Sequence, residues 1–473
     1  MERGREEERA TGHVDESYRD SIATINEEGK RNWIYPKKPH GKLYNLRSVA
    51  SLFYLIVLFG LPFVKYKGEP LFLLNVLERK FILFGVIFWP QDFIIFGLGM
   101  LTFIVFIVLF TVAFGRLFCG WACPQTVFME MVFRKIEYWI EGDAADQRRL
   151  AAMPWNGEKI RKKGLKWFVF YIVSFITANA FLSYIIGVDQ VIHIASDPIS
   201  KHQGGFISIL IFSLVFFFVF AWFREQVCLI VCPYGRLQGV LLDKNSIVVA
   251  YDYVRGEPRG HVKKGEENHF GDCVDCSLCV KVCPTGIDIR NGTQLECVNC
   301  TACIDACDEV MEKVHRPKGL IRYASEEGIK NKVPLKPTRR IYAYSVVLTI
   351  LIGVLVMLLT GRSDTETTIL RAGGQLFQEN PDGTISNLYN VSVINKTRKE
   401  MPIRLVPEEG EGVIQMVGKD IVVGSESKAV GTFFLSRPKN SIHDRKTKIK
   451  IHVYSGEEEL ETVSTNFLGP VSK

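Results

Sequence analysis

Long apolar stretches alternate with charged segments over most of this chain. A helix that crosses a bilayer needs about 20 mainly apolar residues, and five stretches meet that requirement. They are residues 46–64, 92–114, 165–187, 205–223 and 341–360. The pattern predicts an α-helical transmembrane bundle of about five spans, four of them in a membrane domain at 46–223 and the fifth at 341–360.

A further apolar segment, LFLLNVLERKFILFGVIFWP at 71–90, is almost long enough to span a membrane. It carries Glu78, Arg79 and Lys80 in its middle, and charged side chains are costly at the centre of a bilayer. We therefore expect an interfacial or re-entrant helix at 71–90 rather than a sixth span.

The region 361–473 has a different period. Tyr389, Val391 and Val393 alternate with polar residues, and the same alternation recurs at 448–453. This period of two is typical of half-buried strands. A region of this length suffices for an immunoglobulin-like β-sandwich. It contains no cysteine, so we expect it to bind or scaffold a partner.

Composition narrows the class of protein. The 473 residues are 47% hydrophobic and 23% charged, and the clustering of the apolar residues argues against a wholly soluble enzyme, a disordered chain and a fibrous repeat. The formal net charge is +7, without a basic stripe interleaved with aromatic residues. The charge therefore indicates basic flanks of membrane spans and no nucleic-acid partner.

The basic residues also predict an orientation, because Lys and Arg are enriched in cytoplasmic loops. They gather in the arm at 1–45, in the loop at 115–164 and just before the last span, whereas the loop at 188–204 carries only Lys201. We therefore expect the arm and the cysteine-rich segment 224–340 in the cytoplasm, and 361–473 outside it. The arm has no apolar core, which argues against a cleaved signal peptide.

The twelve cysteines fall in four groups, and none lies in the last 166 residues. Disulfide scaffolds spread their cysteines along the chain, whereas tight runs place several thiolates around one centre. Metal or cluster binding is therefore the better interpretation.

Two of these groups, CVDCSLCVKVCP at 273–284 and CVNCTACIDAC at 297–307, match the run C-x2-C-x2-C-x3-C. In such runs three cysteines ligate one [4Fe-4S] cluster and the fourth ligates its neighbour. The spacing thus predicts a bacterial-type 2[4Fe-4S] ferredoxin-like domain at 224–340. The expected ligands are Cys273, Cys276, Cys279 and Cys307 for one cluster, and Cys297, Cys300, Cys303 and Cys283 for the other.

Alternatives to two redox clusters remain. Structural zinc sites use two C-x2-C knuckles placed apart and explain a double run of this spacing poorly. Clusters can also serve purely as structure. Asp308 stands where a proline follows the first run, so the geometry after Cys307 is less defined.

The other two groups form a repeated CxxxCP motif. FGRLFCGWACPQT at 114–126 and FREQVCLIVCPYG at 223–235 align without gaps, and each follows an apolar span. Because proline favours the first helical position, Cys123 and Cys232 are expected to cap helix N-termini. There the helix and the nearby Arg116 and Arg224 should lower thiol pKa values and favour thiolates.

These motif cysteines are the candidate catalytic and copper-binding groups: Cys119, Cys123, Cys228 and Cys232. Soft thiolates suit Cu(I), a further redox centre or reversible dithiol chemistry. The alternative is that they pack as small apolar residues at a helix seam.

Taken together, these motifs resemble the FixG/CcoG family of cytochrome cbb3 oxidase accessory proteins. The resemblance extends over YRDSIATINEEGKRNWIYPKKPHGKLYNLR, FCGWACPQT, VCPYGRLQ, YDYVRGEPRG, the double cysteine run and the C-terminal sandwich. It implies a multi-pass protein of the bacterial inner membrane with a periplasmic C-terminal domain. It also implies oxidase assembly with oxidase subunits or copper-delivery proteins as partners, and reduction of Cu(II) to Cu(I).

The leading hypothesis is a one-electron relay in which an unidentified cytoplasmic reductant loads the two clusters and electrons leave to Cu(II) near the CxxxCP thiols. One alternative is a quinol-oxidising membrane iron–sulfur protein. The other is a non-enzymatic assembly scaffold whose outer sandwich holds an oxidase subunit.

Overall fold

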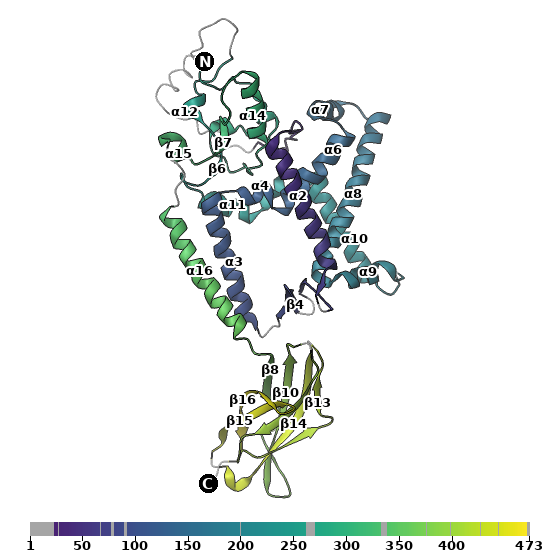
Figure 1. Ribbon diagram of the computed structural model, residues 1–473. Helices are drawn as coiled ribbons and strands as arrows, with labels where there is room; N and C mark the ends of the chain where they lie inside the picture. Colours follow the sequence, from purple (N-terminus) through teal and green to yellow (C-terminus); the bar gives the residue numbers. More distant parts are fainter. Residues whose placement is uncertain are drawn as a thin grey trace. The chain divides into compact units, whose positions relative to one another are not determined.

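The chain forms two compact units in the computed structural model, Met1–Leu355 and Val356–Lys473 (Figure 1). The structure describes residues 23–26, 28–66, 68–76, 80–88, 92–198, 200–261, 270–332, 338–374, 376–397, 399–425, 427–442 and 444–470.

Five helices in the described ranges are long and apolar enough to cross a membrane, which confirms the five predicted spans. They are Lys42–Phe63 (α2, Lys42–Gly60, and η2, Leu61–Phe63), Phe93–Phe114 (α3), Gly157–Ile186 (α8), Gln203–Phe223 (α10, Gln203–Phe218, and the π-helical η5, Val219–Phe223) and Arg339–Thr360 (α16). The most apolar windows of α3 and α16 bury none of their residues inside the protein. Helices that are apolar all round yet unburied are suited to a lipid environment.

The expectation of a helix at 71–90 is wrong in the described part of that segment. Three antiparallel strands are present, β3 (Phe72–Asn75), β4 (Lys80–Leu83) and β5 (Val86–Phe88). β4 and β5 are joined by Phe84 and Gly85, both with positive φ, as a two-residue hairpin turn requires. Leu73, Ile82 and Ile87 pack together on one face. Apolar residues that alternate in burial favour strands, whereas sequence length alone suggested a helix. Glu78 and Arg79 lie outside the described residues.

Short elements connect the spans. They are β1 (Lys65–Tyr66), β2 (Glu69–Pro70), α4 (Leu117–Trp121), α5 (Pro124–Thr126), the π-helical η4 (Val127–Phe133), α6 (Arg134–Ile140), α7 (Ala144–Ala152), α9 (Val188–Ser196), the π-helical η6 (Val227–Val231) and α11 (Pro233–Leu241). Where η4 meets the long helices, Phe133 lies between Phe170 of α8 and Phe220 of η5, with the Phe133 and Phe220 ring centroids 4.4 Å apart. This aromatic cluster forms the core that fixes η4 against the spans.

The two aligned motifs share a backbone conformation. Gly115 has φ 57° and ψ −129°, and Arg224, which aligns with it, has φ 55° and ψ −126°. This left-handed φ is strained for arginine. The predicted caps are confirmed, because Cys123 and Cys232 are the N-cap residues of α5 and α11, each followed by proline.

The cysteine-rich segment folds around a two-stranded antiparallel sheet of β6 (Val248–Tyr251) and β7 (Ile321–Ala324). Short helices surround it: α12 (Tyr253–Gly256), α13 (Leu278–Lys281), η7 (Ile289–Asn291), α14 (Ala302–Lys313) and α15 (Glu326–Asn331). Val249, Ile304, Met311 and Ile321 pack with the cysteines in one buried core. The cysteine runs therefore lie inside a small folded domain.

The second unit is a sandwich of two antiparallel sheets. One has the strand order β12-β14-β10-β8, with β9 paired to β10, and the other has the order β13-β11-β15-β16. The strands are β8 (Thr365–Arg371), β9 (Gln378–Glu379), β10 (Thr384–Asn395), β11 (Met401–Pro407), β12 (Val413–Val417), β13 (Ile421–Val423), β14 (Lys428–Pro438), β15 (Lys446–Ser455) and β16 (Glu458–Leu468), with the 3-10 turn η8 (Lys439–Ser441). Tyr389, Val391 and Val393 are fully buried in the shared core, so the predicted alternation is confirmed.

Candidate redox site

The eight cysteines of the double run surround two adjoining cavities. The first, which we call the Cys273 cavity, is lined by Cys273, Cys276, Cys279 and Cys307. The second, the Cys297 cavity, is lined by Cys279, Cys283, Cys297, Cys300 and Cys303. Cys279 lines both. Cys283 belongs to the first run but lines the Cys297 cavity, and Cys307 belongs to the second run but lines the Cys273 cavity. This exchange is the one that the spacing predicts.

The loops that carry the cysteines share an unusual backbone. Asp275 and Ser277 flank Cys276 with φ near 50°, and Asn299 and Thr301 occupy the same positions around Cys300 with φ of 53° and 66°. Left-handed non-glycine residues cost free energy and tend to occur at functional sites. They let each short loop curl so that successive cysteines line one cavity. Sequence reasoning missed these four residues, although the two-residue spacing of the cysteines was the available signal.

The departure at Asp308 has a structural explanation. Helix α14 continues past Cys307 to Lys313, whereas Pro284 follows Cys283 after the short α13. The Asp308 carboxylate accepts a hydrogen bond from the Gly319 amide at 2.9 Å. Asp308 thus fastens the chain that leaves α14, and no proline is needed there.

The cavities fit iron–sulfur clusters by the chemistry of their donors. Apart from the thiols they are lined mostly by apolar side chains, among them Ile287, Val298, Leu320 and Ile321. Burial raises the pKa of Cys297 to about 12, and the nearby Arg116 opposes that rise. A buried thiol remains protonated at neutral pH unless an iron centre takes the place of the proton. The donor set of both cavities, cysteine sulfurs in apolar surroundings, therefore fits an iron–sulfur cluster.

The four CxxxCP thiols interact with one another. Cys119 lies close enough to Cys123 and Cys232, and Cys228 close enough to all three, for an ionised neighbour to oppose ionisation of the thiol. The Cys119 thiol also donates a hydrogen bond to the Gln238 side chain at 2.9 Å. The tertiary fold thus brings together cysteines from both repeats.

The lowered pKa expected at the caps Cys123 and Cys232 stays a prediction, whereas the other two motif cysteines, Cys119 and Cys228, show a rise. Burial raises the pKa of each to about 12, and neighbouring thiols add to the rise. Arg116 opposes it at Cys119 but is outweighed, and the Arg224 guanidinium is hydrogen bonded to Glu137 instead. Within the described residues, no three His, Cys, Asp or Glu side chains are arranged to hold a single metal ion.

The first CxxxCP loop packs directly on residues 297–301, which we call the Cys297 loop. A Cβ atom added to Gly120 would lie 2.6 Å from the carbonyl oxygen of Val298 and 2.5 Å from that of Asn299. Nearby, the Trp121 indole donates to the Tyr323 hydroxyl at 3.1 Å, and that hydroxyl donates to the Asn299 carbonyl at 3.4 Å. Glycine allows two backbones to approach this closely. The contact joins the two classes of cysteine site.

Two buried arginines join the same surfaces. Arg47 donates to the Gly120 carbonyl at 2.7 Å and to the Cys300 carbonyl at 3.5 Å. Arg116 donates to the carbonyls of Leu295, Cys297 and Gly235. Sequence reasoning named Arg116 for a different role and missed Arg47 altogether, because nothing local distinguishes a carbonyl-binding arginine from a basic flank of a span.

Asp305, between Cys303 and Cys307, caps the first span. Helix α2 begins after Gly41, which has no side chain to cap it, and the Asp305 carboxylate accepts from the amides of Leu43 at 3.1 Å and Tyr44 at 2.7 Å. A carboxylate at a helix N-terminus satisfies free amides and complements the helix dipole.

Replacing Asp305 with alanine should therefore cost about 1–2 kcal/mol of stability and lower the thermal unfolding midpoint in detergent. Asp305→Asn, which keeps an acceptor oxygen, should restore most of the loss. Asp189→Ala removes an exposed pair with Lys65 and serves as the control. An equal midpoint for Asp305→Ala and wild type would contradict the capping role.

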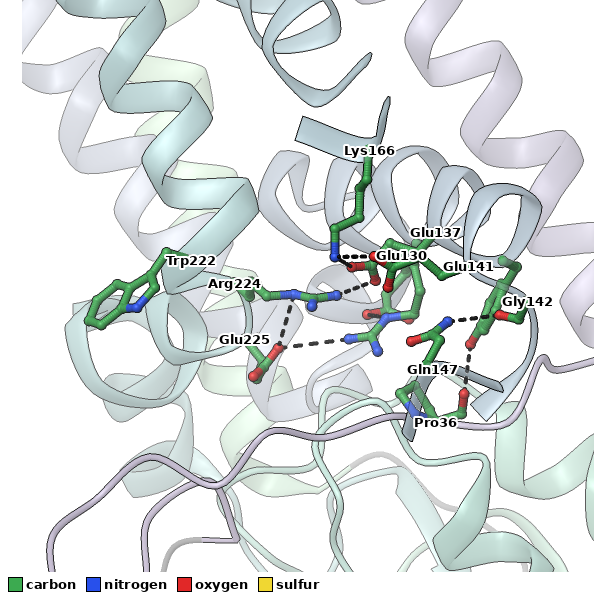
Figure 2. Close-up of polar contacts among 12 residues, drawn as sticks. Pro36, Glu130, Glu137, Glu141, Gly142, Gln147, Lys166, Trp222, Arg224 and Glu225 are labelled. Atoms are coloured by element: carbon green, nitrogen blue, oxygen red, sulfur yellow. Dashed lines mark hydrogen bonds and ion pairs between the residues drawn. The ribbon is translucent and has the colours of Figure 1, made fainter. Parts of the chain in front are cut away.

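A buried ion network lies beside these motifs (Figure 2). Glu137 of α6 accepts from Arg224 and from Lys166 of α8, and Lys166 also pairs with Glu141 at 3.0 Å. Glu225, next to Arg224, pairs with Arg31 of the N-terminal arm at 2.9 Å. The network connects the arm, α6, α8 and the second motif. Burial alone would raise the pKa of Glu137, but Arg224, Lys166 and Arg134 outweigh it and lower it to about 2.

Comparisons with known proteins match three separate parts of the chain. Family models match residues 96–142, described as a 4Fe-4S binding domain, residues 223–326, described as a 4Fe-4S dicluster domain, and residues 355–470, described as the Ig-like fold at the C-terminal of FixG. The first of these covers Cys119 and Cys123.

Three curated relatives are similar over most of their length. Protein RdxA of Cereibacter sphaeroides is 35% identical over 389 residues, which cover 78% of this chain and 80% of RdxA. Protein RdxB of the same organism is 35% identical over 393 residues with the same coverage. The nitrogen fixation protein FixG of Rhizobium meliloti is 32% identical over 467 residues, 87% of each chain. This chain therefore belongs to the FixG/CcoG family of membrane-bound iron–sulfur electron-transfer proteins.

Proposed function

We propose that this protein reduces Cu(II) to Cu(I) at the CxxxCP thiols, with electrons drawn from two [4Fe-4S] clusters, in support of cbb3 oxidase assembly. The observation that carries the proposal is the contact of Gly120 with the backbone of Val298 and Asn299. It places a CxxxCP loop against a cluster loop.

Each side chain has a part in this scheme. Cys273, Cys276, Cys279 and Cys307 would hold one cluster, and Cys283, Cys297, Cys300 and Cys303 the other, as the linings of the two cavities support. Bound clusters supply reversible one-electron transfer. Cys119, Cys123, Cys228 and Cys232 would bind copper as substrate, and soft thiolates favour Cu(I) over Cu(II). The Cys119–Gln238 hydrogen bond holds that thiol in place until copper displaces its proton.

The test uses the purified full-length protein in detergent, reduced without oxygen and then mixed with Cu(II) and a Cu(I)-specific chelator. Wild-type protein should produce Cu(I), and Cys119→Ser or Cys228→Ser should lose most of that yield. Met129→Leu is the control, because Met129 is a soft sulfur on the same segment that packs in the apolar core. Equal Cu(I) yields from the cysteine variants and wild type would overturn the proposed site.

We further propose that the cysteine-bearing surface faces the cytoplasm and the sandwich faces the periplasm, where it would bind an oxidase subunit or a copper-delivery protein. The distribution of Lys and Arg supports this orientation. Protease added to intact spheroplasts should remove the sandwich and leave the double cysteine run uncleaved.

A second candidate function is quinol oxidation, and one cavity favours it. A cavity of about 360 Å³ is lined by Leu242, Asp243, Ser246, Leu295 and Glu296, among others. Its volume is in the range of small-molecule sites, and it adjoins the chain just before Cys297. A soluble quinol analogue should then reduce the clusters, and Leu295→Trp, which fills the cavity, should prevent it.

A further inference from the structure

The two cysteine-lined cavities have different surroundings. Of the twelve cysteines only Cys276, at the Cys273 cavity, is exposed. The Cys297 cavity instead lies against the first CxxxCP loop through the contact at Gly120. A reductant in solution thus approaches the Cys273 cavity most directly, and the membrane thiols approach the Cys297 cavity.

The charged side chains beside the two cavities also differ. Arg116 and Arg47 donate to the carbonyls of Cys297 and Cys300. Both guanidiniums are buried, and neither forms an ion pair with a carboxylate among the residues that the structure describes. The carboxylate of Glu130 also acts on Cys300, but it is paired with Arg134 at 3.0 Å. The positive charges of Arg116 and Arg47 therefore act on the Cys297 cavity without a carboxylate partner of their own.

The arginine at the Cys273 cavity is neutralised. Arg290 lines that cavity, but it pairs with Asp288 at 2.7 Å and also with Asp275. Asp308 lies close enough to act on Cys307. The positive charge of Arg290 is therefore offset by paired carboxylates, in contrast to Arg116 and Arg47.

We propose that Arg116 and Arg47 raise the reduction potential of the cluster in the Cys297 cavity above that of the cluster in the Cys273 cavity, so that electrons run from the Cys276 edge toward the membrane thiols. The reduced form of a cluster carries one more negative charge, which a nearby buried cation stabilises. The identity of the electron acceptor rests on the proposed function, whereas the order of the two reduction potentials does not.

The electron balance is simple. A one-electron carrier protein loses one electron at the Cys276 edge, the electron passes to the Cys297 cavity, and Cu(II) gains it to become Cu(I). No covalent bond forms or breaks in the transfer between the cavities. Arg116 and Arg47 act as positioning residues, because they do not touch copper in this scheme.

The experiment is a potentiometric titration of the full-length, cluster-loaded protein, followed by EPR, with dithionite as the one-electron reductant and no copper. Wild type should show two separate midpoints. Arg116→Gln should lower the higher midpoint and leave the lower one in place, with unchanged iron content. Arg116→Lys, which keeps the charge, should stay close to wild type.

Arg290→Gln is the matched control at the other cavity and should lower the lower midpoint, because it leaves Asp275 and Asp288 without their cation. If Arg116→Gln and Arg290→Gln move the same midpoint, or if Arg116→Gln moves neither, the inference is wrong. Equal shifts for Arg116→Gln and Arg116→Lys would also overturn it, because charge would not be the cause.

The two proposals can fail separately. If wild type does not reduce Cu(II) but the arginine variants shift the midpoints as described, the copper proposal is wrong and the order of potentials stands. If wild type reduces Cu(II) but Arg116→Gln leaves both midpoints unchanged, only the order falls. Arg47→Gln provides a second variant for the same readout should Arg116→Gln fold poorly.

Discussion

Replacing Gly120 with alanine should slow Cu(I) formation on the order of 100-fold, the loss that a displacement of about 1 Å between reacting groups can cause. The added Cβ would lie 2.5 Å from the Asn299 carbonyl oxygen and 2.6 Å from that of Val298. Both obstacles are backbone atoms in a curled loop, so they cannot rotate away as a side chain could. The first CxxxCP loop and the Cys297 loop must then move apart.

The measurement is the rate of chelated Cu(I) formation from reduced protein, together with iron content and the thermal midpoint. Gly99→Ala in α3 is the matched control, because nothing lies within 4 Å of a Cβ at that position. We expect Gly120→Ala to keep both clusters while losing rate. A Gly120→Ala protein that reduces copper as fast as Gly99→Ala would show that electrons do not leave through this contact.

Replacing Glu137 with alanine should destabilise the first unit by about 3–5 kcal/mol, since one partner of a buried ion pair is removed and the other is left uncompensated. Arg224 and Lys166 would both lose their contact with this carboxylate (Figure 2). Arg224 also has a strained backbone, so the loss should release the second CxxxCP motif. The readout is the thermal unfolding midpoint in detergent, monitored by the circular dichroism signal of the helices.

The pH dependence provides an independent check on Glu137. Its pKa is lowered from 4.5 to about 2, which corresponds to about 3 kcal/mol of stability. That stability is present above pH 4.5 and is lost as pH falls toward 2. The wild-type midpoint should therefore fall in this window more steeply than that of Glu137→Gln.

Glu158→Gln serves as the control for both measurements, because the Glu158–Lys162 pair is exposed on α8 and such pairs contribute only about 0.3–0.5 kcal/mol. If Glu137→Ala and Glu158→Gln shift the midpoint equally, the buried network does not hold the motif in place.

The segment at 71–90 illustrates where sequence reasoning fails. Its length and apolar character suggested a helix, but Phe84 and Gly85 turn the chain and Leu73, Ile82 and Ile87 bury one face of a hairpin. An apolar run of this length does not distinguish helix from strands without knowledge of what it packs against. The same limit applies to the motif thiols, because only the tertiary structure shows the burial that raises the pKa of Cys119 and Cys228.

The sequence by itself determined the five spans, the β-sandwich and the grouping of the cysteines, because each depends on a period or a spacing within one short stretch of chain. Only the tertiary structure decided that Gly120 meets the Cys297 loop, that Asp305 caps α2 and that Glu137 binds Arg224. These contacts join residues that are far apart in the sequence. They depend on close packing and buried charge in the folded chain, which no local sequence pattern predicts.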